Sequence, residues 1–211
     1  MTTSVAAQAD PRTEVRLLRR GRRIKADIKL VSWGGAEAIL KDFADRPWPV
    51  RLVGRLQIGR EVRALARLRG IPGVPACYGR WGRHGLLIET MRGERITRWC
   101  QGRTQGVASM FRRLDRLVGA MHARGVIHLD LRKRDNILID AEGRPGIIDF
   151  NASCILPIRG RFGARAARVL RRIDLWAVGK WKLRLAPELL APEERRRHRR
   201  MTSLRRLWIF N

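Results

Sequence analysis

The segment 109–150 constrains the fold of this 211-residue chain more than any other stretch. Residues 109–125 place apolar side chains at helical spacing and end at a glycine, which is a frequent helix stop. A polar break follows, and then two short apolar runs, 137–140 and 147–150, flank a turn that contains glycine and proline. Such a pair of runs is typical of a β-hairpin. We therefore expect a long helix, a polar loop and a hairpin in this order.

The residues before this helix predict a small sheet with one helix. Alternating apolar and polar side chains indicate two strands within 24–43, joined near Gly34-Gly35. Residues 84–93 indicate a buried strand that runs into a polar edge. Residues 54–70 have apolar side chains near helical spacing, followed by a closing glycine, and predict a helix. The apolar positions of this helix are Leu56, Ile58, Val62, Leu65 and Leu68.

The remaining segments give weaker patterns. Residues 1–23 are polar and basic, and we expect them to be irregular or partly helical. Residues 71–79 are typical of a turn-rich connector. Beyond residue 157 the chain is expected to be helical and very basic, with the terminal apolar run 207–211 packed back onto the body.

Charge is the strongest compositional signal. The chain has 46 Lys and Arg residues against 19 acids, a net charge of +27. An anionic partner such as nucleic acid, a lipid surface or a phosphorylated glycan would explain this excess, and so would a GC-rich genome. Three cysteines are too few and too scattered for a disulfide framework, which indicates a reducing compartment; they are Cys77, Cys100 and Cys154. Without an apolar leader or a long apolar span, we expect a cytoplasmic protein, soluble or peripheral to a membrane.

The order of the charged residues indicates a specific chemistry. Phosphoryl transfer needs a cation on the nucleotide phosphates, an acid that holds this cation, oxygen ligands for magnesium and a carboxylate facing the attacking hydroxyl. Lys41, Glu61, Asp130, Asn136 and Asp149 supply one candidate for each role. Each residue alone is a weak signal, because a strand lysine is usually solvated and a helix glutamate often pairs with its own helix. The polar break could also be a surface turn. The ordered combination is what favours a functional site.

In this order, residues 24–153 resemble the protein-kinase-like superfamily. The segment AILKDF is similar to the kinase strand with the phosphate-binding lysine, and GREVRALARL to the helix that follows it. LLIETMRG resembles the hinge, LVGAMHARGVIHLDLR the long helix and catalytic loop, and IIDFN the metal-binding Asp-Phe-Gly segment.

The resemblance implies a role for each candidate residue, with ATP and Mg²⁺ as cofactors. Lys41 would bind the phosphates and pair with Glu61, and Ile88 would line the back of the nucleotide pocket. Backbone groups from Glu89 to Met91 would meet the adenine. In the loop, Asp130 would orient the acceptor hydroxyl, Arg132 would neutralise the transferred phosphoryl group and His128 would support the loop. Asn136 and Asp149 would hold magnesium, with Asp135 as the second candidate, because the loop is one residue longer than the usual kinase pattern.

The implied fold is α+β, with a small N-terminal antiparallel sheet lobe that has one helix and a trimmed helical C-terminal lobe. The corresponding domains are a basic extension at 1–23, the N-lobe at 24–92 and the C-lobe at 93–211. Three departures stand out: only Gly21 precedes the first expected strand in place of a Gly-rich loop, Asn151 replaces the third-position glycine, and little chain follows. The segments 174–179 and 186–189 resemble kinase fragments in reversed order, and we interpret them as chance matches.

The resemblance is strongest to small bacterial lipopolysaccharide-core kinases, which act on Kdo or heptose, and to RIO-type kinases. It implies an ATP- and Mg²⁺-dependent kinase acting on a glycolipid sugar or a protein Ser/Thr, with an anionic acceptor and peripheral contact at the inner face of the inner membrane. The alternative is a non-catalytic kinase-like module that binds an anionic membrane surface or nucleic acid. Nucleic-acid binding through 192–208 is not expected, because Leu204 and Leu207 would face inward on a helix whose arginines are solvated.

Overall fold

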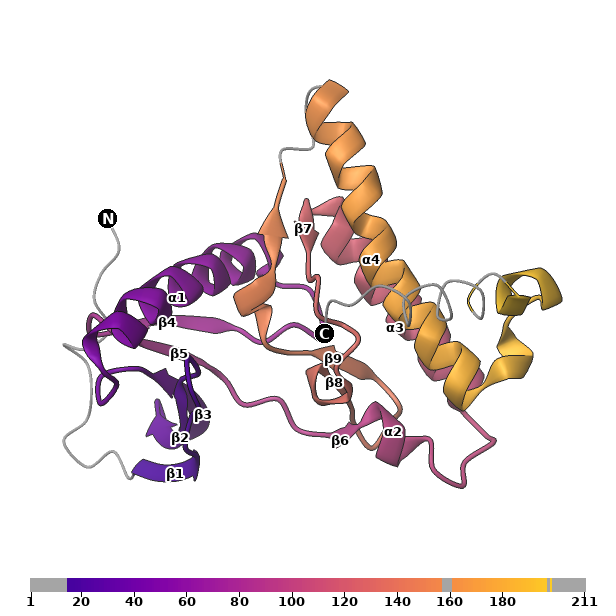
Figure 1. Cartoon of the computed structure of the whole chain (residues 1–211). Coiled ribbons are helices and arrows are strands. Elements are labelled where there is room, and N and C mark those ends of the chain that lie inside the picture. Colours follow the sequence, from indigo (N-terminus) through magenta and orange to yellow (C-terminus); the bar gives the residue numbers. More distant parts are fainter. Residues whose placement is uncertain (1–14, 157–160, 197, 199–211) are drawn as a thin grey trace. The chain divides into compact units, whose positions relative to one another are not determined.

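The fold of the computed structural model is α+β, as predicted, with an open antiparallel sheet and several helices (Figure 1). The structure describes residues 15–156, 161–196 and 198. It divides into two compact units, and each is described by itself. Unit 1 comprises Met1–Met91 and Ile148–Ile155, and unit 2 comprises Arg92–Ile147 and Leu156–Asn211.

Unit 1 is built on a five-stranded antiparallel sheet of order β1-β2-β3-β5-β4. Its strands are β1 Val15–Arg19, β2 Asp27–Trp33, β3 Ala36–Asp42, β4 Cys77–Trp81 and β5 Gly85–Glu89. The predicted β2–β3 hairpin turns at Gly34 and Gly35, whose φ angles are 56° and 79°. This positive-φ pair is what a two-residue hairpin turn requires, and it explains why glycine occupies both positions.

Two strands correct the sequence interpretation. Residues 15–19 were expected to be irregular or helical, but they form β1, which pairs antiparallel with β2. The five residues of β1 show no apolar alternation, whereas the pairing uses backbone groups that any side chain permits. Likewise β4 begins at Cys77, inside the segment predicted to be a connector, and pairs with β5.

One face of the sheet carries an apolar cluster of unit 1. Val31, Ala38, Leu40 and Leu87 are at most 3% exposed and pack together. The rings of Trp33 and Trp81 close the cluster edge to face, with centroids 6.1 Å apart. Burial of each large apolar side chain stabilises the fold by roughly 1.5–3 kcal/mol, so this cluster holds the strand that carries Lys41.

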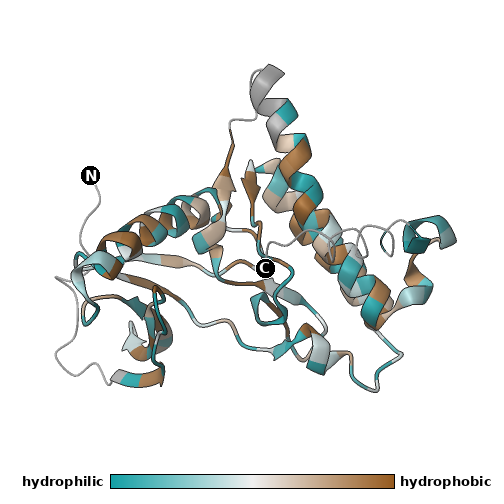
Figure 2. Cartoon of the chain, viewed as in Figure 1, coloured by the Kyte–Doolittle hydropathy of each residue, from teal (hydrophilic) through white to brown (hydrophobic). Residues whose placement is uncertain are grey.

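Helix α1, Trp48–Leu68, begins six residues before the predicted start. Pro47 is its N-cap and Pro49 lies in the first turn, where a missing N–H is tolerated. Gly54 is required by close packing, because a Cβ there would lie 2.5 Å from the Phe43 ring. Apolar residues interleave with polar ones along α1 (Figure 2), and Leu56, predicted on the buried face, is 63% exposed. The buried face instead includes Ile58, Glu61, Ala64, Leu65 and Leu68.

Unit 1 also contains the segment after the hairpin. It consists of the short 3-10 helix η3, Phe150–Ala152, and the strand β10, Cys154–Ile155. Both pack against α1. Phe150 is fully buried, so this segment is anchored against the helix that carries Glu61.

Unit 2 contains the predicted helix, loop and hairpin. Helix α3, Val107–Ala123, ends before Gly125, and the predicted hairpin pairs Ile137 with Ile147. Helix α4, Arg161–Leu185, confirms the helical prediction beyond residue 157 and packs against α3. The remaining elements are β6 Glu94–Arg95, α2 Ile96–Trp99, β7 Val126–Ile127, η2 Arg134–Asn136, β8 Ile137–Ile139, β9 Pro145–Ile147 and η4 Pro187–Leu189. β6 extends the hairpin to three strands.

Two sequence interpretations fall on residues that the structure does not describe. They are the packing of the terminal run 207–211 and the inward orientation of Leu204 and Leu207. Within the described ranges, we find no helix that is long and apolar enough to cross a membrane.

Candidate functional site

Unit 1 brings together three of the predicted site residues around one buried ammonium. The Lys41 Nζ on β3 lies 2.7 Å and 2.9 Å from the two carboxylate oxygens of Glu61 on α1. It also lies 3.0 Å from Oδ1 of Asp149. Glu61 is 2% exposed, and its Oε1 accepts a further hydrogen bond from the Phe150 N–H at 3.2 Å. A strand, a helix and the segment after the hairpin thus meet at one ion-pair cluster.

Electrostatics keep this lysine charged. Burial lowers the pKa of Lys41, but the charges and hydrogen bonds of Glu61 and Asp149 outweigh burial, and the pKa lies above its ordinary value. A buried charge is stable only when it is paired in this way. The cluster therefore offers a permanent cation beside two carboxylates, which is the arrangement expected of a phosphate-binding lysine.

Asp149 is held in an uncommon backbone conformation. Its φ is 70° and its ψ is 65°, in the left-handed region that costs most residues about 1 kcal/mol or more. The buried ring of Phe150 and the 2.6 Å hydrogen bond from Ser153 Oγ to the Phe150 carbonyl stabilise the turn that follows. Strain of this kind persists where the surroundings over-determine a geometry, which is typical of functional segments.

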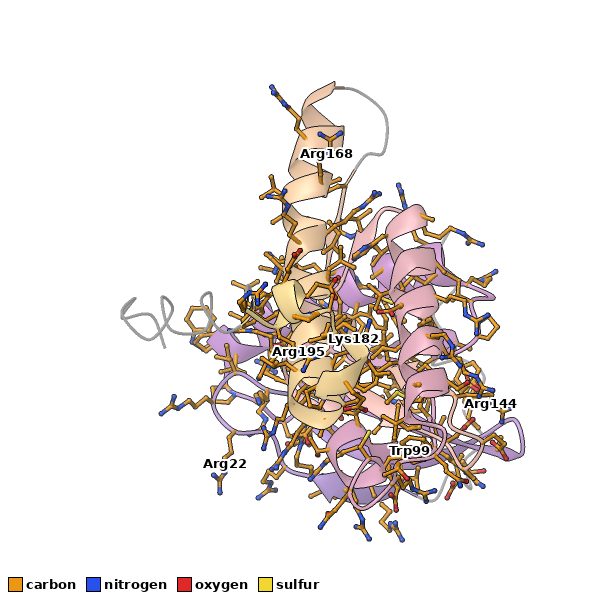
Figure 3. All side chains as sticks on the ribbon, turned by 90° about the vertical axis from the view of Figure 1, so that its right-hand side faces the viewer. Arg22, Trp99, Arg144, Arg168, Lys182 and Arg195 are labelled. Atoms are coloured by element: carbon orange, nitrogen blue, oxygen red, sulfur yellow. The ribbon has the colours of Figure 1, made fainter. Side chains whose placement is uncertain are left out.

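The connection between β1 and β2 is the segment where a Gly-rich phosphate-binding loop would be expected from the kinase resemblance. Gly21 lies in this connection, rather than before the first strand as expected. A Cβ at Gly21 would lie 2.1 Å from the Lys25 carbonyl oxygen, so the turn is too tight for another residue. The Gly21 N–H donates to Asp27 at 2.7 Å, and Arg46 contacts both residues. Arg22 projects from this connection (Figure 3).

Unit 2 holds Asp130 and Asn136 side by side. The Asn136 Nδ2 donates to the Asp130 carbonyl at 3.0 Å and to its Oδ2 at 3.3 Å. The Lys133 ammonium also contacts Asp130 Oδ2. Asn136 is 3% exposed, and its amide nitrogen is engaged with Asp130, so Oδ1 is the atom that suits a cation.

The loop is one residue longer than the usual kinase pattern, and Asp135 lies outside the contact between Asp130 and Asn136. Asp135 lies in the 3-10 turn η2, its side chain is 54% exposed, and Arg95 Nε pairs with it at 2.7 Å. The structure therefore brings Asn136, and not Asp135, to Asp130. The role of either residue as a metal ligand stays a prediction. Within the described ranges, no group of three or more His, Cys, Asp or Glu residues could hold a metal ion.

Asp174 on α4 is a site residue that the sequence interpretation missed. Its carboxylate is fully buried and accepts the backbone N–H groups of His128 and Leu129, both at 2.8 Å. His122 Nε2 lies 3.0 Å from the same carboxylate. Leu129 has a φ of 66°, so Asp174 stabilises a strained backbone directly before Asp130. Segment 174–179, interpreted from the sequence as a chance match, thus contains the residue that anchors the loop.

His128 and Trp181 complete the support of this loop. His128 is fully buried, and its Nδ1 accepts the Asp130 N–H at 3.3 Å, which is the supporting place predicted for it. Trp181 Nε1 on α4 donates to the Leu131 carbonyl at 2.8 Å. The signal for Asp174 was available in the sequence, because it is the only acid among eight Lys and Arg residues in 161–185.

The positions of the other predicted residues say less about their function. Arg132 is exposed on the loop, and Ile88 is 4% exposed within β5. The Glu89 N–H donates to the Ala76 carbonyl at 2.9 Å, so this group is already engaged by the residue before β4. Met91 follows β5 and is partly exposed. Contact of these residues with a nucleotide stays a prediction.

Comparison with known proteins supports a protein-kinase-like relationship. No protein-family model matches the chain. The chain is similar to CBL-interacting protein kinase 25 of Oryza sativa subsp. japonica, with 29% identity over 138 residues, which is 60% of this chain and 26% of the plant protein. The chain thus spans about a quarter of the length of that relative. The similarity does not bear on the lipopolysaccharide-core or RIO subfamilies.

Proposed function

We propose that the chain is an ATP- and Mg²⁺-dependent phosphotransferase that transfers the γ-phosphate to an alcohol. The observation that carries this proposal is the buried Lys41 ammonium, held by Glu61 and Asp149. Such an ion pair is costly to bury and is retained where its charge has a task. The similarity to a plant protein kinase supports the same reaction class.

The residues fit the two cofactors by their donor types. Lys41 would bind nucleotide phosphate, and Ile88 with the backbone near Glu89 and Met91 would contact the base. Asn136 Oδ1 and the Asp149 carboxylate are the hard oxygen ligands that magnesium prefers. Asn136 directly precedes β8, and Asp149 follows β9 after one residue in a hairpin that pairs Ile137 with Ile147. When bound, magnesium would neutralise charge on the phosphates.

Asp130 would position the acceptor hydroxyl and accept its proton. Its carboxylate is held by Asn136 and Lys133, so its orientation is set before a substrate arrives. Arg132, two residues on, would balance charge on the transferred group. Arginines of the β1–β2 connection, such as Arg22, would cover the phosphates in place of glycine backbone, because guanidinium groups bind phosphate well.

For the acceptor alcohol we propose two classes of molecule and not a single compound. A lipopolysaccharide-core sugar and a protein Ser/Thr are the two candidates, and the net charge of +27 supports an anionic acceptor. The same charge supports a cytoplasmic protein that binds peripherally to an anionic membrane face.

A nucleotide-dependent shift in thermal unfolding tests the proposal. MgATP at about a hundredfold over its dissociation constant should stabilise the wild type by about 2.7 kcal/mol. Lys41→Met should lose this stabilisation. Lys29→Met is the matched control, because Lys29 lies on the neighbouring strand and pairs with Asp42 at 2.6 Å. If MgATP stabilised none of these proteins, the non-catalytic module would be the better account.

A further inference from the structure

Helix α4 has many more basic residues than acidic ones. Segment 161–185 contains eight Lys and Arg residues and a single acid, Asp174. That acid is fully buried and is used by the backbone N–H groups of His128 and Leu129. It therefore balances none of the cations on the exposed side of the helix.

Two lysines on this helix have different surroundings. Lys182 Nζ lies 2.6 Å from the Asp115 carboxylate on α3 and is thereby balanced. Lys180, two residues away, stands over the Trp181 ring with its Nζ 4.8 Å from the ring centroid. Within the described part of the chain, no carboxylate pairs with Lys180 or with Arg184.

The loop after Asp130 likewise contains both cations that are paired with a carboxylate and one that is not. Lys133 contacts Asp130, and Arg134 lies 3.8 Å from Asp135. Arg132, between Asp130 and these residues, is exposed and has no acidic partner among the described residues. The loop therefore leaves one guanidinium without an acidic partner among the described residues, two residues after Asp130.

The two segments that carry these cations, α4 and the loop after Asp130, are in contact. The buried hydrogen bond from Trp181 Nε1 to the Leu131 carbonyl, 2.8 Å long, joins α4 to the loop, so Lys180 and Arg132 are the chain neighbours of its two ends. Burial, followed by the charges of Arg132 and Arg184, lowers the pKa of Lys180. Gathering like charges costs free energy that a bound anion would recover.

We propose that Lys180 and Arg184, together with Arg132 at the border of the transferred group, bind a phosphate group that the acceptor alcohol already carries. The inference rests on the proposed function, because it assigns the acceptor of that reaction. Three cations favour a dianionic phosphate over a single carboxylate, and guanidinium groups bind its oxygens in pairs. The substrate class is therefore an alcohol with a phosphate close to the hydroxyl that Asp130 positions.

Competitive acylation of lysines with acetic anhydride, read residue by residue by mass spectrometry, tests the site without ATP. Inorganic phosphate should slow the acetylation of Lys180 relative to chloride at the same ionic strength, and should leave Lys182 unchanged as the internal control. The indole N–H resonance of Trp181 gives a second readout, which should shift with phosphate in the wild type and not in Lys180→Gln.

Arg184→Gln should raise the phosphate concentration for half-protection of Lys180 by about tenfold, as expected for one lost charge-assisted hydrogen bond. Arg168→Gln is the matched control, because it removes the same charge from an exposed position near the other end of α4 (Figure 3). Equal protection by chloride, equal protection of Lys182, or an equal effect of Arg168→Gln would overturn the proposal.

The outcome separates this inference from the proposed function. Selective protection of Lys180 in a protein that transfers no phosphate from ATP would support the anion site and refute the kinase. Phosphate transfer by a protein whose Lys180 is not protected would support the kinase and refute the anion site.

Discussion

The buried carboxylate of Asp174 is the most informative single position to perturb. In Asp174→Asn one oxygen becomes an NH₂ group without a change in size. Oδ1 accepts the Leu129 N–H and Oδ2 accepts the His128 N–H. Whichever way the amide turns, one of these two N–H groups, buried at His128 and part-buried at Leu129, loses its acceptor.

The expected loss in free energy of unfolding follows from these two hydrogen bonds. A buried donor without a partner costs about 1–3 kcal/mol, and the surviving hydrogen bond loses the roughly 1 kcal/mol that a charged acceptor adds. The loss in free energy of unfolding should therefore be about 3 kcal/mol. Total stabilities are about 5–15 kcal/mol, so the variant should still fold. Its loop before Asp130 should lose the restraint on the strained Leu129 backbone, and phosphate transfer should fall.

Urea unfolding measures this loss, with Asp115→Asn as the control. Asp115 is a half-exposed carboxylate paired with Lys182, so its substitution should cost less than about 1 kcal/mol. Hydrogen exchange should show faster exchange of the His128 and Leu129 amides in Asp174→Asn alone. A loss no larger than that of Asp115→Asn, with unchanged exchange, would refute the anchoring role.

Three further predictions concern single sites. Asn136→Ala should reduce phosphate transfer far more than Asp135→Ala in a kinase assay, because Asn136 contacts Asp130; equal losses would contradict the assignment of Asn136 over Asp135. Burial raises the pKa of Cys100 to about 11, so iodoacetamide at pH 8 should label it only after unfolding, and rapid labelling of the native protein would contradict its burial. Burial raises the pKa of Asp140, but the hydrogen bonds and charge of Arg144 lower it more, to below the unfolded value. The pair therefore stabilises the fold above that unfolded value and loses its effect as pH falls through the folded pKa. Arg144→Gln should be less stable than the wild type at neutral pH and equally stable in acid, as urea unfolding would show; a deficit that persists in acid would mean another cause.

Much of the site was predictable because its signals are local. The Lys41 strand, the Glu61 helix and the hairpin before Asp149 each have a clear periodicity over a few residues. Their order along the chain then indicated the chemistry. The choice between Asn136 and Asp135 also rested on the hairpin, since only Asn136 directly precedes its first strand.

The rest depended on tertiary contacts that no local pattern records. β1 is basic, and only its pairing with β2 makes it a strand. Asp174 stands out as the single acid of segment 161–185, but the His128 N–H group that donates to it lies 46 residues away in the chain, so the contact itself could not be predicted. The early start of α1 depends on a proline-rich first turn that looked like a break.

The central claim is that this chain moves phosphate from ATP to an alcohol through Asp130. Its most direct test offers γ-labelled ATP with Mg²⁺ to a lipopolysaccharide extract, to a generic protein substrate and to the chain itself. The wild type should label at least one acceptor, Asp130→Asn should label none, and Asp115→Asn should match the wild type. No labelled acceptor with the wild type, or undiminished labelling by Asp130→Asn, would contradict the account.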